Sequence, residues 1–160
     1  MTIRQHQIEI TWTCEGKEPL KGEMSCWANA ALNDVMGNAV EISLKVVSIG
    51  EMTQLNHQYR GKDKATNVLS FPADTNCEVM TEEGLPLLGD IAICLDLVKT
   101  EAKDQEKSLS EHFAHLLIHG ILHLAGYDHE EDEEALIMEG KETQILSTLG
   151  IKAPYENGSR

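Results

Sequence analysis

The run HGILHLAGYDH, residues 119–129, constrains this chain more than any other part of its sequence. His119 and His123 are four residues apart, so on a helix their side chains lie on one face and can bind one metal ion. Gly126 can adopt the left-handed backbone conformation that ends a helix, and the chain can then bring His129 to the same ion. Three imidazole ligands with an open fourth position are typical of catalytic zinc, so the run predicts one Zn²⁺ per chain.

Other polar residues lie close to this run. His115 precedes His123 by eight residues, which is about 12 Å along a helix axis. The ligand nitrogens of a tetrahedral zinc ion lie only about 3.4 Å apart, so a straight helix cannot bring both residues to one ion. We therefore expect His115 to support the site without binding the ion, and Asp128 to orient a ligand or cap the turn. We expect His112 to be solvated.

The length of 160 residues is sufficient for one domain with its own hydrophobic core. We expect that domain to span residues 1–150 and residues 151–160 to form a frayed tail. No apolar run is long enough to span a membrane, and the N-terminal segment lacks the features of a signal peptide, so we expect a cytoplasmic protein without a membrane partner. Four widely spaced cysteines are expected to be reduced thiols used in packing: Cys14, Cys26, Cys77 and Cys94.

The hydrophobic pattern predicts an α+β domain in which a mixed sheet of about four strands packs with about five helices, the metal-binding helix being central. Strands are expected over residues 8–12, 41–47, 68–71 and 89–94, and a long loop over residues 73–88. Helices are expected over residues 20–35, 48–59, 96–107, 131–149 and from residue 108 through the histidine run. Ser48 and Ser108 each begin a capping box, and Gly61 is expected to end the helix that Ser48 begins.

The spacing of the histidine run equals that of the metzincin protease signature HExxHxxGxxH, but one residue differs. The protease requires Glu after the first histidine as general base, and this chain has Gly120 there. The sequence therefore argues against peptide hydrolysis by that route. A phosphodiester is a better substrate for such a site, because positive charge can stabilise its transition state without a carboxylate base.

Charge is distributed unevenly along the chain. The net charge of −14 argues against indiscriminate binding to nucleic acid. Residues 41–72 nevertheless carry four basic and three acidic residues, and Arg60 lies there at an expected helix end. A guanidinium binds phosphate in a bidentate manner, so Arg60 is a candidate for stabilising the transition state. The alternative is that Arg60, Lys62 and Lys64 are solvated charges that interact favourably with a helix dipole.

Three segments, in this order and spacing, resemble the bacterial YbeY endoribonucleases: YRGKDKATNVLSFP, LLGDIAIC and HGILHLAGYDH. The resemblance covers about residues 40–150. Ala65 departs from it, since many members have Pro at this place, and this should change loop stiffness more than chemistry. The resemblance implies a cytosolic, zinc-dependent, single-strand-specific endoribonuclease. It further implies a role in maturing the 3′ end of 16S ribosomal RNA, in ribosome biogenesis and in ribosome quality control.

The same resemblance assigns roles to residues and suggests partners. It implies His119, His123 and His129 as metal ligands, and Arg60 and His119 as catalytic residues. We also expect Lys62, Lys64 and Phe71 to contact the substrate. Expected partners are single-stranded RNA, the ribosome or its small subunit, an assembly GTPase and a small-subunit ribosomal protein.

Two other functions remain open at this stage. One is a ribosome-assembly binding factor in which the metal mainly holds the fold, and the other is a zinc peptidase with a base from elsewhere in the chain. A binding factor would keep its association with the ribosome after loss of the metal-site chemistry. A peptidase would keep its proteolytic activity after Arg60→Ala.

Overall fold

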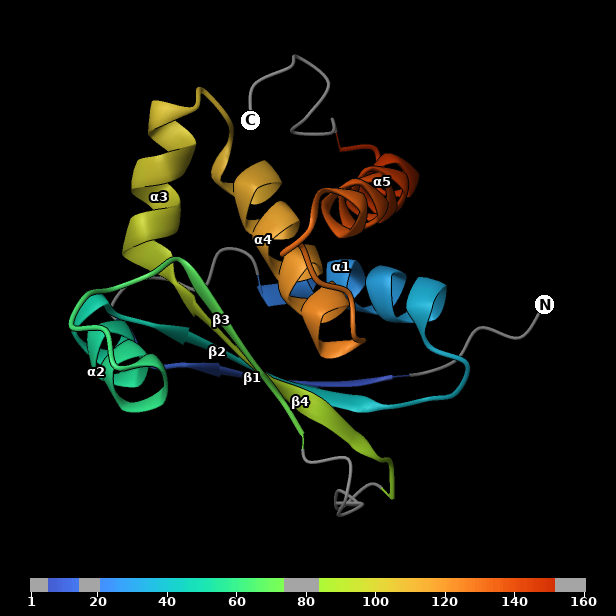
Figure 1. Cartoon of the computed structure of the whole chain (residues 1–160), viewed down its shortest axis with the longest axis horizontal. Helices are drawn as coiled ribbons and strands as arrows, with labels where there is room; N and C mark the ends of the chain where they lie inside the picture. The colour runs from blue at the N-terminus through green and yellow to red at the C-terminus, as the bar shows by residue number, and fades with distance from the viewer. Residues whose placement is uncertain (1–5, 15–20, 74–83, 152–160) are drawn as a thin grey trace.

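The computed structural model describes residues 6–14, 21–73 and 84–151, which fold into four strands and five helices (Figure 1). The strands are β1 (Gln7–Trp12), β2 (Glu41–Val47), β3 (Val68–Pro72) and β4 (Leu87–Cys94). The helices are α1 (Lys21–Val35), α2 (Ile49–Arg60), α3 (Leu95–Asp104), α4 (Leu109–Leu124) and α5 (Asp132–Thr148). The predicted α+β class is confirmed.

The four strands form one mixed sheet in the order β1-β2-β4-β3. Strands β1, β2 and β4 are parallel to one another, and the edge strand β3 runs antiparallel to β4, with Ser70 opposite Ile91. Buried residues dominate β2 and β4, as expected for strands covered on both faces, whereas half-buried and exposed residues alternate in β1 at the opposite edge. Strand β3 therefore forms one edge of the sheet, and the site described below lies beside this edge.

Helix α4 lies at the centre of the fold. Figure 1 shows α1, α4 and α5 on one side of the sheet and α2 on the other, and α4 contacts α1, α3, α5, β3 and β4. Its capping box is present as predicted: Ser108 Oγ accepts a hydrogen bond from the Glu111 backbone N–H at 3.1 Å, and the Glu111 carboxylate accepts one from the Ser108 backbone N–H at 3.4 Å. Phe113, Leu117 and Ile121 are fully buried in the main core. Burial on most sides fixes the rotation of α4, and with it the direction of its histidines.

Helix α4 approaches the sheet most closely at Gly120. Ser70 Oγ donates a hydrogen bond to the Gly120 carbonyl oxygen at 3.2 Å. A Cβ atom at position 120 would lie 3.2 Å from Ser70 Oγ and 3.3 Å from two methyl groups of Ile91. Position 120 is where the metzincin signature has its general base, and here the space for a side chain is filled by the sheet. A glutamate at this position would crowd the sheet, so packing as well as chemistry disfavours that base here.

Element boundaries differ from the prediction by more than one residue at two places. Strand β4 begins at Leu87, two residues earlier than expected. Helix α3 ends at Asp104 instead of residue 107, because Glu106 adopts a left-handed conformation (φ 56°) and the Lys107 N–H bonds back to the Ala102 carbonyl oxygen at 2.8 Å. Most of the predicted loop and nearly all of the predicted tail lie outside the described residues.

The start and end of α2 match the prediction. Ser48 Oγ accepts a hydrogen bond from the Glu51 N–H at 3.2 Å, and Gly61 ends the helix with φ 68°. This ending matters for the site, because it places Arg60 on the last turn of α2, next to β3.

The described cysteines are free thiols, as expected: Cys14, Cys26 and Cys94. Cys94 is buried, but Cys26 is exposed, so its predicted use in packing is wrong. Cys77 lies outside the described residues. Among the helices of the described ranges, none combines the length and the apolar character needed to cross a membrane.

A larger side chain at position 120 should separate α4 from the sheet. We expect Gly120→Leu to lower the free energy of unfolding by about 1–3 kcal/mol, the typical cost of overpacking a core. Gly140 is the matched control, since it lies exposed in α5 with no atom within 4 Å of an added Cβ. Gly140→Leu should raise stability by up to about 1 kcal/mol through helix propensity. Urea denaturation measures both, and equal effects of the two substitutions would contradict the close contact at Gly120.

Candidate metal centre

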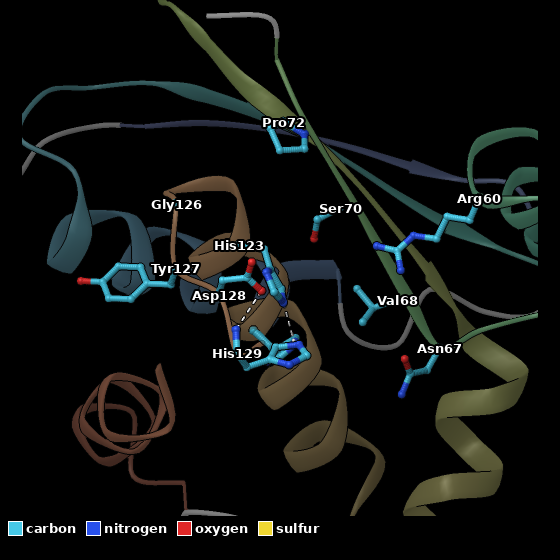
Figure 2. Close-up of a pocket in the computed structure, with 11 residues that line it drawn as sticks. Arg60, Asn67, Val68, Ser70, Pro72, His123, Gly126, Tyr127, Asp128 and His129 are labelled. Carbon is cyan, nitrogen blue, oxygen red and sulfur yellow. Dashed lines mark hydrogen bonds between the residues drawn. The ribbon is translucent and has the colours of Figure 1, made fainter. Parts of the chain in front are cut away.

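The three histidines of the run come together in the structure. His119 and His123 lie on α4, and His129 follows the turn after it. One nitrogen from each ring lies within 4.8 Å of the others. The Nε2 atoms of His119 and His123 are 3.1 Å apart, and the ring of His129 faces both from the other chain segment (Figure 2). The arrangement is the one that the spacing of the run predicts.

The turn that delivers His129 is held by backbone hydrogen bonds. Gly126 has φ 105°, and the Tyr127 N–H returns to the Leu122 carbonyl oxygen at 2.9 Å. Asp128 Oδ1 then accepts a hydrogen bond from the His129 backbone N–H at 2.8 Å. Asp128 was predicted either to orient a ligand or to cap the turn, and this hydrogen bond corresponds to capping the turn.

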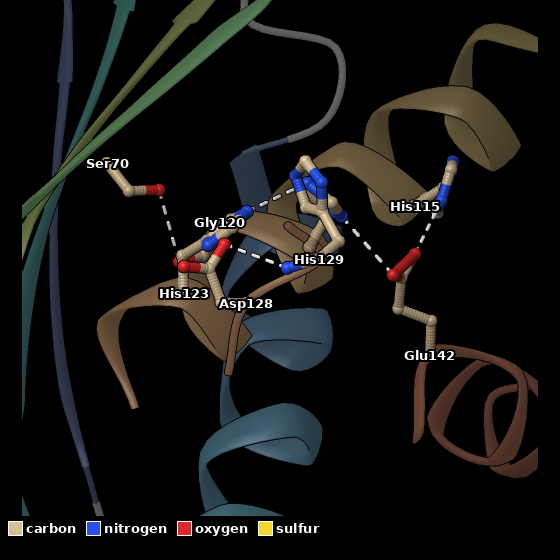
Figure 3. Close-up of polar contacts among 8 residues, drawn as sticks. Ser70, His115, Gly120, His123, Asp128, His129 and Glu142 are labelled. Atoms are coloured by element: carbon tan, nitrogen blue, oxygen red, sulfur yellow. Dashed lines mark hydrogen bonds and ion pairs between the residues drawn. The ribbon is translucent and has the colours of Figure 1, made fainter. Parts of the chain in front are cut away.

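Glu142 on α5 connects the site to the rest of the protein, and the sequence analysis did not single it out. Its side chain is 1% exposed and accepts hydrogen bonds from His115 Nε2 at 2.8 Å and from His119 Nδ1 at 3.2 Å (Figure 3). Burial opposes ionisation of this carboxyl group, but the hydrogen bonds from His115 and His119 outweigh it and lower the pKa of Glu142 to about 2. Glu142 is thus a buried carboxylate at neutral pH.

The contact with Glu142 determines which nitrogen of His119 can bind a metal ion. A carboxylate only accepts hydrogen bonds, so His119 Nδ1 carries the proton and Nε2 presents its lone pair to His123 and His129. Burial lowers the pKa of His123, and the neighbouring His119 and His129 lower it further, which favours its neutral form. Neutral imidazoles are the form that binds metal, so this donor set fits a divalent ion such as Zn²⁺.

The two remaining histidines of α4 lie outside this ligand group. His115 lies beside it and contacts Glu142, on the side of the site away from the cleft. The prediction that His112 is solvated is wrong: its side chain is 4% exposed, and its Nε2 lies 2.8 Å from Glu101 Oε1. Helix α3 packs against α4 and brings Glu101 over His112. Burial lowers the pKa of His112, and the contact with Glu101 opposes that effect.

The histidines form one wall of a cleft of about 420 Å³, and β3 forms the other. Val68, Ser70 and Pro72 line it from the strand, while Leu69 and Phe71 face the opposite side. Arg60 also lines this cleft, although it belongs to α2 on the far face of the sheet. Figure 2 shows its guanidinium pointing toward β3, with the histidine wall on the other side of the strand. A cation suited to phosphate and a candidate metal site therefore share one cleft.

The candidate substrate contacts occupy different places. Lys62 and Lys64 line an adjoining hollow of about 410 Å³, which shares Arg60 and Asn67 with the histidine cleft. Phe71 does not line the histidine cleft. It packs against Tyr59 on the α2 face of the sheet, with the ring centroids 4.8 Å apart.

Comparison with known proteins agrees with this geometry. A model of the family described as endoribonuclease YbeY matches residues 7–150. The chain belongs to the YbeY endoribonuclease family. The solution structure of TM1509 from Thermotoga maritima is 27% identical, with 96% of this chain and 100% of that chain covered and a TM-score of 0.58. The resemblance drawn from the three sequence segments is therefore confirmed, and YbeY membership makes this chain a hydrolase of RNA.

Glu142 should contribute to metal affinity in this YbeY protein without touching the ion. An amide has only one acceptor oxygen, so Glu142→Gln would turn an N–H₂ group toward His115 or His119 and disturb the tautomer of the ligand. We expect the affinity for Zn²⁺, measured by competition with a chromophoric chelator, to fall by about 10–100-fold. Glu133→Gln, at an exposed position of the same helix, is the control. Unchanged affinity in Glu142→Gln would remove Glu142 from the metal site.

Proposed function

We propose that this protein is a zinc-dependent endoribonuclease that cleaves single-stranded RNA. In the cytoplasm it would mature the 3′ end of 16S ribosomal RNA and act in ribosome biogenesis and quality control. The observation that carries the proposal is that Arg60 and three imidazoles line one cleft in a member of an endoribonuclease family. The small ribosomal subunit, one of its proteins and an assembly GTPase are the proposed partners.

The roles of the residues follow from their chemistry. His119, His123 and His129 would hold the ion, and the catalytic role proposed for His119 is to hold it in the tautomer that Glu142 fixes. A zinc ion bound there supplies Lewis acidity toward a phosphoryl oxygen and lowers the pKa of water. Arg60 would bind the phosphate through two N–H groups and stabilise the charge that develops on its non-bridging oxygens.

The surroundings of Arg60 support a role in substrate binding over a structural one. Arg60 is exposed and forms no hydrogen bond or ion pair within the described part of the chain. A structural arginine would be expected to have such a partner. This observation favours a nuclease over a binding factor in which the metal only holds the fold.

The cleft is poorly suited to a zinc peptidase. A side chain at position 120 would crowd Ser70 and Ile91 of the sheet, and Glu142 is buried behind His119, where it binds two imidazoles. Among the described residues that line the cleft, Asp128 is the one carboxylate, and its Oδ1 accepts the His129 N–H. A peptidase base would have to come from outside this set.

RNA end mapping tests the proposal directly. The purified protein is incubated with a single-stranded RNA and with the same sequence in a duplex, with and without a chelator. Internal cuts in the single strand that disappear with the chelator and return with Zn²⁺ are expected. Cleavage that persists after complete metal removal would overturn the metal dependence, and absence of any cleavage would favour the binding factor.

Arg60 should affect the rate of cleavage and leave the metal site intact. We expect Arg60→Ala to keep its fold and zinc content and to lose about 10²–10³ in the cleavage rate, the typical effect of removing a transition-state donor. Arg60→Lys should recover only part of the rate, because an ammonium keeps the charge and lacks the two-pronged geometry. Lys103→Ala, at an exposed position on α3, is the control. Full activity in Arg60→Ala would refute this role.

Lys62 and Lys64 should contribute to RNA binding and not to the chemical step. For Lys62→Gln/Lys64→Gln we expect weaker RNA binding and a less steep dependence of log K on log salt, by about 0.7 for each phosphate that the variant no longer neutralises. The rate at saturating RNA should change little. Lys99→Gln/Lys103→Gln removes the same charge from α3, outside the hollow. An equal loss of affinity in this control would show that net charge alone is responsible.

A further inference from the structure

Asn67 lies between the histidine cleft and the adjoining hollow. It precedes β3 directly and lines both the histidine cleft and the hollow of Lys62 and Lys64. Arg60 is shared by the same two spaces. A strand of RNA whose phosphate contacts Arg60 would therefore pass Asn67, whichever way it continues.

The side-chain amide of Asn67 is oriented by a partly buried chain of polar groups. Its Nδ2 lies 3.1 Å from Glu101 Oε1 and 3.4 Å from Glu101 Oε2. The same Oε1 is 2.8 Å from Nε2 of His112, which is 4% exposed. Because a carboxylate only accepts hydrogen bonds, Asn67 must present its N–H₂ group to Glu101. The position of its carbonyl oxygen then follows.

The Oδ1 atom of Asn67 is left as an acceptor toward the cleft. It accepts no hydrogen bond from the described residues, and Figure 2 shows it on the side of Val68, with Nδ2 turned away. The nearby cations Arg60, Lys62 and Lys64 are donors only and match phosphate oxygens. Asn67 therefore fits a neutral donor on the part of the strand next to the phosphate.

We propose that Asn67 accepts a hydrogen bond from a ribose 2′-hydroxyl and thereby favours RNA over DNA. The inference rests on the proposed nuclease function. The 2′-hydroxyl is the donor that RNA has and DNA lacks, and every ribonucleotide carries it whatever its base. Asn67 would thus select the sugar without selecting a sequence, while Glu101 and His112 act as positioning residues that hold the amide in place.

The test compares the affinity for RNA with the affinity for DNA. Full-length, zinc-loaded protein is titrated with fluorescent single strands of one sequence, in ribo and deoxyribo form, with phosphorothioate linkages that resist cleavage. We expect Asn67→Ala to weaken RNA binding by about two- to tenfold, the effect of removing one hydrogen bond, and to leave DNA binding unchanged. Gln144→Ala, an exposed amide on α5, should change neither affinity. Equal weakening of RNA and DNA binding in Asn67→Ala would overturn the inference.

A second measurement uses the unaltered protein, so it does not depend on the folding of a variant. Single 2′-deoxy substitutions are moved along the RNA strand, and one position is expected to lose affinity by a similar factor. If no position is sensitive, or if the sensitivity follows a base amino group instead of the sugar, the inference is wrong. RNA cleavage that continues with unchanged sugar preference in Asn67→Ala would refute only this inference. If the unaltered protein bound neither the RNA strand nor the DNA strand, the proposed function would be refuted as well.

Discussion

The buried carboxylate of Glu142 is the interaction on which the site depends. It accepts hydrogen bonds from His115 and His119, and it belongs to α5, so it joins two helices through polar contacts inside an apolar environment. An ionised carboxylate at 1% exposure is costly unless donors surround it, and the two imidazoles provide them. The same contacts select the tautomer of His119. The packing of α5 against α4 and the chemistry of the candidate metal site therefore rest on one group.

The second requirement is the close approach of α4 to the sheet. Gly120 allows this approach, and Ser70 marks it with a hydrogen bond from the edge strand to the helix backbone. The histidine wall and the strand wall of the cleft are held at a fixed separation by this contact. Arg60 reaches the cleft from the other face of the same strand. The cleft is thus assembled beside β3, with the three histidines on one side and Arg60 reaching it from α2 on the other.

Features that depend on local spacing could be predicted from the sequence. The cluster of three histidines, the cap at Ser108 and the turn at Gly126 follow from short-range geometry, and the structure contains all three features. Glu142 could not be found in this way, because its partner His119 lies 23 residues away and depends on how α5 packs on α4. One signal in the sequence could have indicated Glu142. It lies four residues after Met138 and three before Ile145, which places an acidic residue on the apolar face of α5. The burial of His112 could not be predicted either, because it depends on how the preceding helix, α3, packs against α4 and places Glu101 beside His112.

The two halves of the site come from separate stretches of the chain. The groups that would hold the ion lie in α4 and the turn after it, supported by Glu142 of α5, whereas Arg60 ends α2 and is followed by Lys62, Lys64 and Asn67 before β3. A glutamate from another helix orients a side chain in each stretch: Glu142 accepts a hydrogen bond from His119, and Glu101 accepts one from Asn67. If the proposed function holds, sequence changes between residues 60 and 67 would therefore alter which nucleic acid is bound without altering which metal ion is bound. In evolutionary terms, substrate choice in such a protein can diverge while its inorganic chemistry stays constant.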